Sequence, residues 1–266
     1  MELFQYEFFL KALLAAIFAS ISCGLIGTYV VSRRIVFISG GITHAAFGGI
    51  GLAFLLGFNP LLGAVLFAIT SALGIQFFTK VAKIREDSSI AIWWSLGMAL
   101  GIIFVYITPG YTPNLMSYLF GNILTVSIAE LWWMFALNIV IILFFTFFLR
   151  QILYIAFDEE FARAAGLPVA FFNYLTITLV ALTVVLNIRV VGIILILSLL
   201  TIPQATANLC TFNFRKLLWL SSFFAFIGTI SGLIISYFLD IPSGAAIIFT
   251  LIIIFVIMKV LKTWLI

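Results

Sequence analysis

The stretch Leu131–Leu149, LWWMFALNIVIILFFTFFL, contains no charged residue and only two polar ones, Asn138 and Thr146. A helix of this length measures about 28 Å, close to the hydrocarbon thickness of a bilayer. Charged residues flank it on both sides, Glu130 before it and Arg150 after it. Because a helix satisfies all its backbone hydrogen bonds internally, as a membrane requires, this stretch predicts a membrane-spanning helix.

The composition of the whole chain agrees with this prediction. Hydrophobic residues make up 65% of the 266 residues and charged residues 8%, against about 25% charged in ordinary soluble domains. This excludes a water-soluble fold. The sequence predicts an all-α, polytopic transmembrane bundle in which residues 1–266 form a single domain, with about eight or nine spans and no extramembrane domain.

The candidate spans are the apolar runs between polar breaks. The second span and the junction at Arg189 are the most interrupted, which leaves the count at eight or nine. The nine candidates are residues 9–31, 35–58, 60–80, 90–108, 130–150, 171–188, 190–210, 217–239 and 244–264.

The basic residues predict how these spans are oriented. If the breaks alternate between two sides, only Lys11 and Arg189 fall on one side, and the other side collects Arg33, Arg34, Lys80, Lys83, Arg85, Arg150, Arg163, Arg215, Lys216, Lys259 and Lys262. The positive-inside rule makes the crowded side cytoplasmic, which places the N-terminus outside and the C-terminus in the cytoplasm. The basic residues stand singly or in pairs beside apolar runs, so the net charge of +4 does not indicate a nucleic-acid partner.

Two segments break the apolar spans with glycine, proline and polar residues: 38–51 in the second span and 198–208 in the seventh. Irregular backbone at membrane depth is tolerated only where protein or a watery cavity covers it. Pro203 frees a backbone carbonyl in the seventh span, which suggests that this span faces a cavity or a partner helix. The glycines of the second span, taken alone, favour a surface for close helix packing.

The candidate metal path starts from His44, the only histidine, which lies near the membrane midplane in its predicted span. Imidazole is a favoured ligand for divalent transition metals, although a histidine bonded to a neighbouring carbonyl fits the position equally well. Thr43 and Ser39 lie beside it, and Gln204 lies in the second interrupted segment. Asp240 sits at the predicted outer mouth, either as a charged rim or as a turn residue.

The connection 157–168 predicts a short cytoplasmic helix that starts with acidic residues and ends at Gly166 and Pro168. Phe157, Phe161 and Ala165 share one face of it. Acidic residues fit poorly against an anionic leaflet, so we expect this helix to dock on a protein partner. No phosphate-binding loop and no two-histidine zinc motif occur, which predicts that any ATP hydrolysis takes place on another subunit.

These residues resemble a family, the zinc and manganese group of ATP-binding-cassette (ABC) importer permeases of bacterial inner membranes. The likeness extends over nearly the whole chain. The stretches that carry it are Ser39–Ala45, Phe157–Arg163, Ala165–Leu167, Gly192–Ala205 and Asp240–Ala246.

The resemblance implies a permease subunit that pairs with a second copy of itself, docks a cytoplasmic ABC ATPase and receives metal from an extracytoplasmic binding protein. It implies no permanently bound cofactor, ATP only on the partner subunit, and a transported divalent metal, zinc first, then manganese or iron. The segment Asp158–Leu167 would be the coupling helix, with Asp158, Glu159, Glu160, Phe161, Arg163 and Gly166 as the residues that couple to the ATPase.

One position departs from the family pattern, because Gly40 stands where some members carry an aspartate. A single imidazole per subunit makes a poor closed site for zinc, so we expect a weak transit contact. An ATP-independent secondary transporter is the main alternative, although all nine acids lie at or outside span ends. An intramembrane hydrolase is disfavoured because neither Ser39 nor Ser198 lies in a G-x-S-x-G elbow.

Overall fold

The computed structural model describes residues 6–109 and 121–264, and these residues form helices and connections without a strand. Nine of the described helical segments are long and apolar enough to cross a membrane, which confirms the predicted fold class. The elements are α1 Glu7–Ser32, α2 Val36–Leu56, α3 Pro60–Lys80, α4 Glu86–Ile107, the 3-10 turn η2 Ile123–Thr125, α6 Ile128–Phe157, α7 Glu159–Ala164, α8 Val169–Val191, α9 Ile193–Leu199, α10 Ile202–Cys210, α11 Phe214–Leu239 and α12 Ser243–Trp264.

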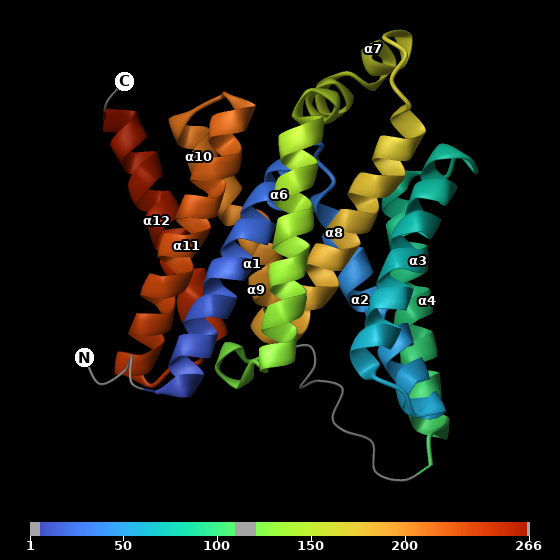
Figure 1. Cartoon of the computed structure of the whole chain (residues 1–266), viewed down its shortest axis with the longest axis horizontal. Helices are drawn as coiled ribbons and strands as arrows, with labels where there is room; N and C mark the ends of the chain where they lie inside the picture. The colour runs from blue at the N-terminus through green and yellow to red at the C-terminus, as the bar shows by residue number, and fades with distance from the viewer. Residues whose placement is uncertain (1–5, 110–120, 265–266) are drawn as a thin grey trace.

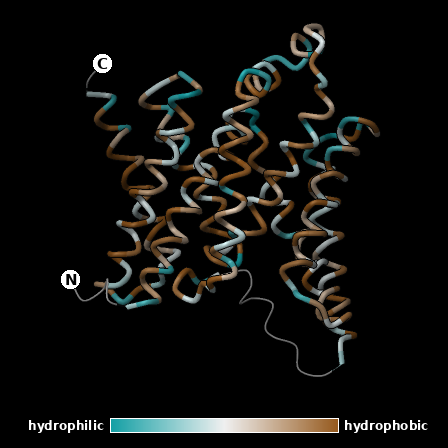
Figure 2. The backbone as a smooth tube through the Cα atoms, in the orientation of Figure 1, coloured by the Kyte–Doolittle hydropathy of each residue, from teal (hydrophilic) through white to brown (hydrophobic). Residues whose placement is uncertain are grey.

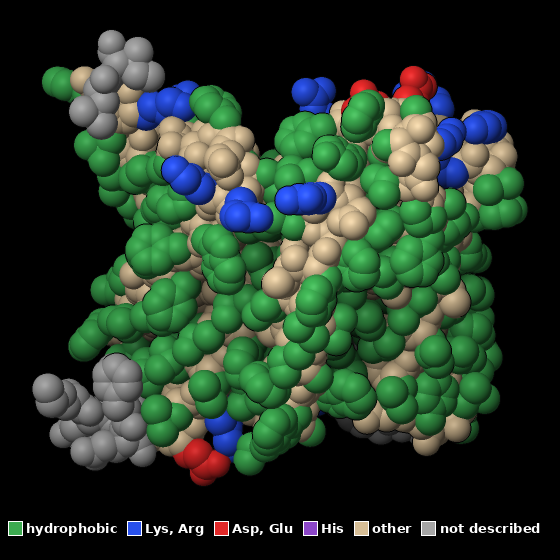
Figure 3. Space-filling view, turned by 45° about the horizontal axis from the view of Figure 1, so that its top comes forward, with side chains coloured by type: hydrophobic (Ala, Val, Ile, Leu, Met, Phe, Trp, Pro, Cys, Tyr) green, Lys and Arg blue, Asp and Glu red, His purple; other side chains and the backbone are tan. Residues whose placement is uncertain are grey.

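The spanning helices stand side by side, and α7 lies at one end of the bundle (Figure 1). Apolar residues dominate the middle of each span, whereas hydrophilic residues gather at the helix ends and near α7 (Figure 2). Lys and Arg side chains spread along one rim above a broad apolar band (Figure 3). The start of α1 and the end of α12 lie at opposite ends of the bundle, as nine crossings require.

The helices pack in two groups around α1. On one side, α2 packs against α3 and α4, and α3 packs against α8. On the other side, α11 packs against α10 and α12. Helix α1 touches α6, α8 and α11 and so lies between the two groups (Figure 1).

Helix α2 corrects the expectation of a break in the second span, because residues 36–56 form one uninterrupted α-helix. Its glycines serve close packing instead. A Cβ added at Gly49 would collide with the backbone of Gly63 in α3, and one added at Gly51 would collide with the backbone of Gly101 in α4. Small residues at helix contacts let backbones approach closely, which is how helices in lipid gain van der Waals contact.

The seventh span is broken, as its proline and polar residues predict. Helix α9 ends at Leu199 and α10 begins at Ile202. The junction predicted at Arg189 lies three residues further along, because α8 continues to Val191 and the chain turns at Gly192. Gly192 has φ +82°, a conformation that side chains with a Cβ rarely adopt.

We expect Gly49→Ala to lower the stability of the protein by about 1–3 kcal/mol, because the new methyl group has no space against α3. The matched control is Gly244→Ala, where an added Cβ meets no atom within 4 Å. Thermal unfolding of both purified variants in detergent measures the difference. Equal melting temperatures for the two variants would contradict the packing role of Gly49.

Candidate metal path and coupling helix

His44 lies on α2 and is partly exposed. Its ring stacks on that of Trp94 from α4, with centroids 4.1 Å apart and planes 8° apart. Its Nδ1 atom is buried and has no hydrogen-bond partner in the described part of the chain. A carbonyl of a neighbouring helix, the alternative that the sequence left open, does not bond this nitrogen.

Ser39 and Thr43 lie on α2 within one and a half turns of His44, and both side chains are buried. Each hydroxyl donates to a carbonyl of its own helix, Ser39 to Val36 O and Thr43 to Ser39 O at 2.7 Å. Such bonds satisfy the hydroxyl inside an apolar environment. In this conformation neither hydroxyl hydrogen points toward a shared path with His44.

Gln204 has a structural position inside the subunit and is 1% exposed. Its Nε2 donates to Cys23 O of α1 at 2.8 Å and to Leu199 O at 3.1 Å. Leu199 O is the carbonyl that the residue four positions later would normally bond, and that residue is Pro203, which has no N–H. The Gln204 amide thus replaces the missing backbone donor at the break between α9 and α10.

Asp240 caps the C-terminus of α11 in the left-handed conformation, with φ +52°, and is exposed. It lines a cavity of about 760 Å³ at the end of the bundle away from α7, together with residues from η2 and from the starts of α1, α9 and α12. Asp240 thus lies at an end of the bundle, beside a cavity. The same geometry also makes Asp240 a turn residue.

The predicted path residues do not form one cluster. Ser39, Thr43 and His44 share α2, Gln204 bonds α1 to the α9–α10 break, and Asp240 lies at the end opposite α7. Within residues 6–109 and 121–264, no three His, Cys, Asp or Glu side chains come close enough to hold a metal ion. A single subunit in this conformation therefore offers a metal individual contacts and no closed site.

The predicted short helix of residues 157–168 is present as α7. Asp158 caps its N-terminus, and the Asp158 Oδ1 atom accepts a hydrogen bond from the Phe161 N–H at 2.8 Å. At the other end Gly166 has φ +80°, and its N–H donates to Arg163 O at 3.1 Å. These are the capping features of a helix that stops abruptly, which explains why six residues suffice to form it.

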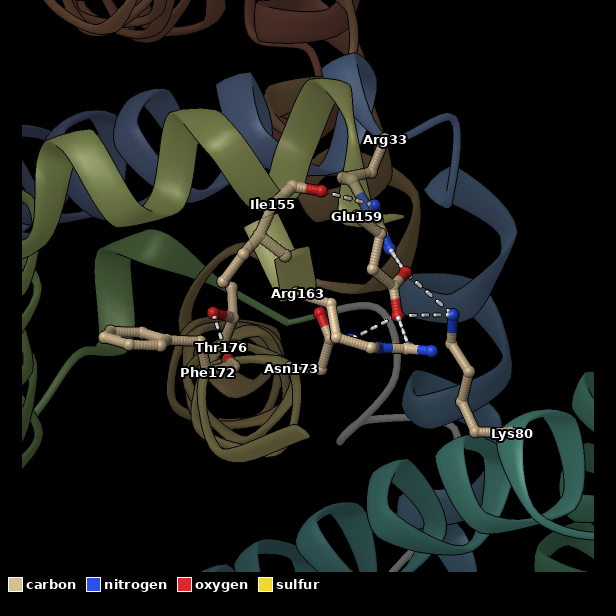
Figure 4. A network of polar contacts seen from close by, with 8 residues as sticks. All are labelled: Arg33, Lys80, Ile155, Glu159, Arg163, Phe172, Asn173 and Thr176. Atoms are coloured by element: carbon tan, nitrogen blue, oxygen red, sulfur yellow. Dashed lines mark hydrogen bonds and ion pairs between the residues drawn. The ribbon is translucent and has the colours of Figure 1, made fainter. Parts of the chain in front are cut away.

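Glu159 points inward from α7 and holds charged groups from two other helices (Figure 4). Its Oε2 lies 3.1 Å from Arg33 Nη2 and 2.9 Å from Lys80 Nζ. Its Oε1 accepts from Asn173 Nδ2 at 3.2 Å and lies 3.6 Å from Arg163 Nη2. A carboxylate with three cationic neighbours and an amide donor is fully paired.

The pKa of Glu159 reflects competing effects. Burial opposes its ionisation and is the largest single influence, but the hydrogen bonds and charges of Lys80 and Arg33 together outweigh it. The pKa of Glu159 is therefore lowered from its ordinary value of 4.5. At neutral pH this carboxylate is ionised.

The opposite face of α7 is open. Phe161 is 54% exposed and Phe157 is 70% exposed, and Glu160 and Ala165 are exposed beside them. Within the described residues, only neighbouring side chains of the bundle contact this face, such as Tyr154 beside Phe161. The face that the sequence predicts for a protein partner thus consists of aromatic rings and one free carboxylate, whereas Glu159 belongs to the inner face.

Sequence reasoning missed several members of these sites. Trp94 was an ordinary apolar residue of the fourth span, and no pattern in the sequence connects it to His44. Arg33 and Lys80 were treated only as orientation signals, and Asn173 was not noticed. The sequence signal that Arg33, Lys80 and Asn173 share is weak: they are polar residues near helix ends, on the same predicted side as the acidic short helix.

Comparison with known proteins shows which family the chain belongs to. The ABC 3 transport family matches residues 5–262, which is nearly the whole chain. The chain belongs to this family. It is therefore a multi-pass permease of a bacterial inner membrane, as its resemblance implied, and its relatives are transport subunits rather than enzymes.

Several similar members of the ABC 3 family are named as manganese transport proteins. The manganese transport system membrane protein MntC of Listeria monocytogenes is 36% identical over 253 residues, covering 95% of this chain and 90% of that protein. The manganese import system permease protein ScaB of Streptococcus gordonii is 32% identical, covering 96% and 91%. The structure of PsaBC from Streptococcus pneumoniae with Fab has a TM-score of 0.84, 33% identity, and covers 96% and 92%.

We expect Gln204→Leu to destabilise the ABC 3 permease by about 1–3 kcal/mol, because it removes the amide that donates to Cys23 O and leaves Leu199 O, which Pro203 cannot bond, without a donor. Pro203→Ala in the same chain should recover part of this loss, because alanine supplies an N–H to Leu199 O. The measurement is the melting temperature of the single and double variants in detergent. A double variant less stable than Gln204→Leu alone would show that the missing proline donor is not what Gln204 replaces.

The lowered pKa of Glu159 predicts a dependence of stability on pH. A carboxylate whose pKa falls on folding stabilises the protein fully above its unfolded pKa, and this contribution disappears as the pH drops through the folded value. We therefore expect the stability advantage of the wild type over Glu159→Gln to be constant near neutral pH and to shrink below pH 4.5.

The measurement is thermal unfolding of both proteins in detergent along a pH series. Glu160→Gln is the matched control, because Glu160 is exposed and forms no ion pair within the described residues. Its difference from the wild type should stay small at every pH. A wild-type advantage over Glu159→Gln that persists unchanged down to about pH 3 would contradict the assignment.

Proposed function

We propose that this chain is the permease subunit of an ABC importer that moves manganese into the bacterial cytoplasm. Manganese is the metal in the names of similar relatives that cover nearly the whole chain. Zinc, which the family resemblance implied first, and iron have no corresponding support from these names. The match of residues 5–262 to the ABC 3 transport family is the observation that carries the proposal.

The positions of the residues support a path beside α2. His44 stacks on Trp94, which holds its ring in one plane, and remains partly exposed on the subunit. Manganese accepts imidazole together with oxygen ligands. Because one subunit supplies a single imidazole, the metal completes its coordination from water and from a second copy of the chain, which faces the first across the path.

A weak site of this kind suits transport. An ion that is held by few protein ligands exchanges them quickly for water and can leave as readily as it enters. Gly40, one helical turn before His44, adds no carboxylate to the path. Asp240 and the cavity beside it lie at the outer end, where an extracytoplasmic binding protein delivers the metal.

The exposed face of α7 supports docking of a cytoplasmic ATPase subunit. Aromatic rings such as Phe161 bury large apolar areas at protein interfaces, and a free carboxylate such as Glu160 can meet a basic partner residue. This assignment makes the rim that carries α7 cytoplasmic. It places the N-terminus outside and the C-terminus inside, in agreement with the distribution of basic residues.

Transport by the reconstituted complex tests the proposal. Proteoliposomes that contain the chain and the ATPase encoded beside its gene are supplied with the external binding protein, radioactive manganese or zinc, and ATP. We expect ATP-dependent manganese uptake that falls about tenfold in His44→Ala. Thr70→Val is the control for reconstitution, since its exposed hydroxyl bonds only its own helix.

The alternatives give different results in the same experiment. Uptake that continues without the ATPase would indicate a secondary transporter. Uptake of zinc but not manganese would overturn the proposed metal and leave the permease role. An assembled complex that transports no divalent metal would contradict metal import itself.

A further inference from the structure

Helix α7 is attached to the bundle on one side only. Its neighbours are α6 and α8, and Ala162 is its buried residue. The ion pairs that leave α7 reach Arg33 at the end of α1 and Lys80 at the end of α3. Among the described residues, no ion pair joins α7 to α10, α11 or α12, although the ends of α11 and α12 carry four cations: Arg215, Lys216, Lys259 and Lys262.

Within residues 6–109 and 121–264, all the charge contacts between α7 and other helices pass through a single side chain. The Glu159 carboxylate binds Arg33, Lys80 and Asn173, which belong to the α1–α2 joint, α3 and α8 (Figure 4). Its side chain is 19% exposed, so it is shielded from solvent and from a partner docked on the open face. Its neighbour Glu160 has the same chemistry and lies on the open face.

Arg33 connects this cluster to the helix that carries His44. Its Nη1 also donates to Ile155 O of α6 at 2.7 Å. The joint that follows is tight, because Arg34 N bonds Val31 O and Ile35 N bonds Val30 O before α2 begins at Val36. His44 lies eight residues further along, about 12 Å up the helix.

The helices reached by Glu159 form one packed unit. Helix α2 meets α3 and α4 through glycines whose backbones touch the neighbouring helix, and α3 packs against α8. Tightly packed helices move together, because their interfaces do not deform gradually. A displacement of α7 that keeps its ion pairs therefore carries α2, α3 and α8 with it.

We propose that Glu159 is a positioning residue that latches α7 to the α2–α3–α8 unit and so transmits movement of the ATPase to the helix that carries His44. This inference rests on the proposed function, because it takes α7 as the docking element. It assigns Glu159 a role different from that of the exposed residues beside it. Glu160 and Phe161 meet the ATPase, whereas Glu159 passes the movement on.

Glu159→Gln tests the latch in the reconstituted complex, because it keeps the shape of the side chain and removes its charge. We expect the variant to assemble with the ATPase and to hydrolyse ATP, while the number of metal ions imported per ATP falls about tenfold. Glu160→Gln is the matched control, and its ratio of metal to ATP should equal that of the wild type even if assembly weakens.

Lys80→Met tests the same contact from α3. It should also lower the ratio of metal to ATP, and the double variant with Glu159→Gln should be no worse than the worse single variant, because both remove one interaction. Independent losses that multiply in the double variant would overturn the latch. So would a Glu159→Gln complex that fails to assemble, or one with an unchanged ratio.

Hydrogen exchange of the permease alone tests the latch without transport. We expect faster amide exchange in residues 158–167 and in the α1–α2 joint of Glu159→Gln, and unchanged exchange in Glu160→Gln. Absence of ATP-driven uptake in the wild type would reject the proposed function, whereas unchanged exchange in Glu159→Gln would reject the latch itself. A loss of protection throughout the chain would also reject it, because Glu159 would then be a general stabiliser.

Discussion

The hydrocarbon core of a bilayer contains no water to bond a backbone N–H or C=O group, and the rest of this structure follows from that constraint. The described spans are helices, and hydroxyls within them bond their own helix, as Thr43 bonds Ser39 O and Thr183 bonds Leu179 O. Where the chain breaks between α9 and α10, Gln204 supplies the donor that Pro203 lacks. An unbonded carbonyl at membrane depth is costly, and Gln204, the residue that follows the proline, supplies the hydrogen bond that Leu199 O needs.

The same solvent changes how helices adhere. Lipid tails are as apolar as leucine side chains, so burial of apolar surface contributes little to association, and close contact must replace it. The glycines of α2 allow the backbones of α3 and α4 to approach it directly. This packing fixes the position of His44 on α2 and stacks the Trp94 ring on its imidazole. In the proposed path, this imidazole is a transit contact without a closed cage of ligands.

Charge plays its role at the ends of the bundle. The short helix α7 has two faces with different surroundings: Glu159 faces inward to Arg33 and Lys80, and Phe161 with Glu160 faces outward. A helix of six residues would not be stable alone, since helix nucleation is costly. The caps at Asp158 and Gly166 and the ion pairs of Glu159 hold it in place against the spans.

The spans, their order and the short helix between the fifth and sixth spans could be predicted from the sequence, because hydropathy, proline, glycine and charge act locally. The candidate residue His44 could also be predicted, since an ionisable group within an apolar run is unusual. The continuity of α2 could not be predicted, because glycine permits both a break and a close contact, and only the neighbouring helices decide between them. The same holds for the inward turn of Glu159. Its partners Arg33, Lys80 and Asn173 lie on three different helices, and a contact between helices distant in sequence exists only once the bundle is packed.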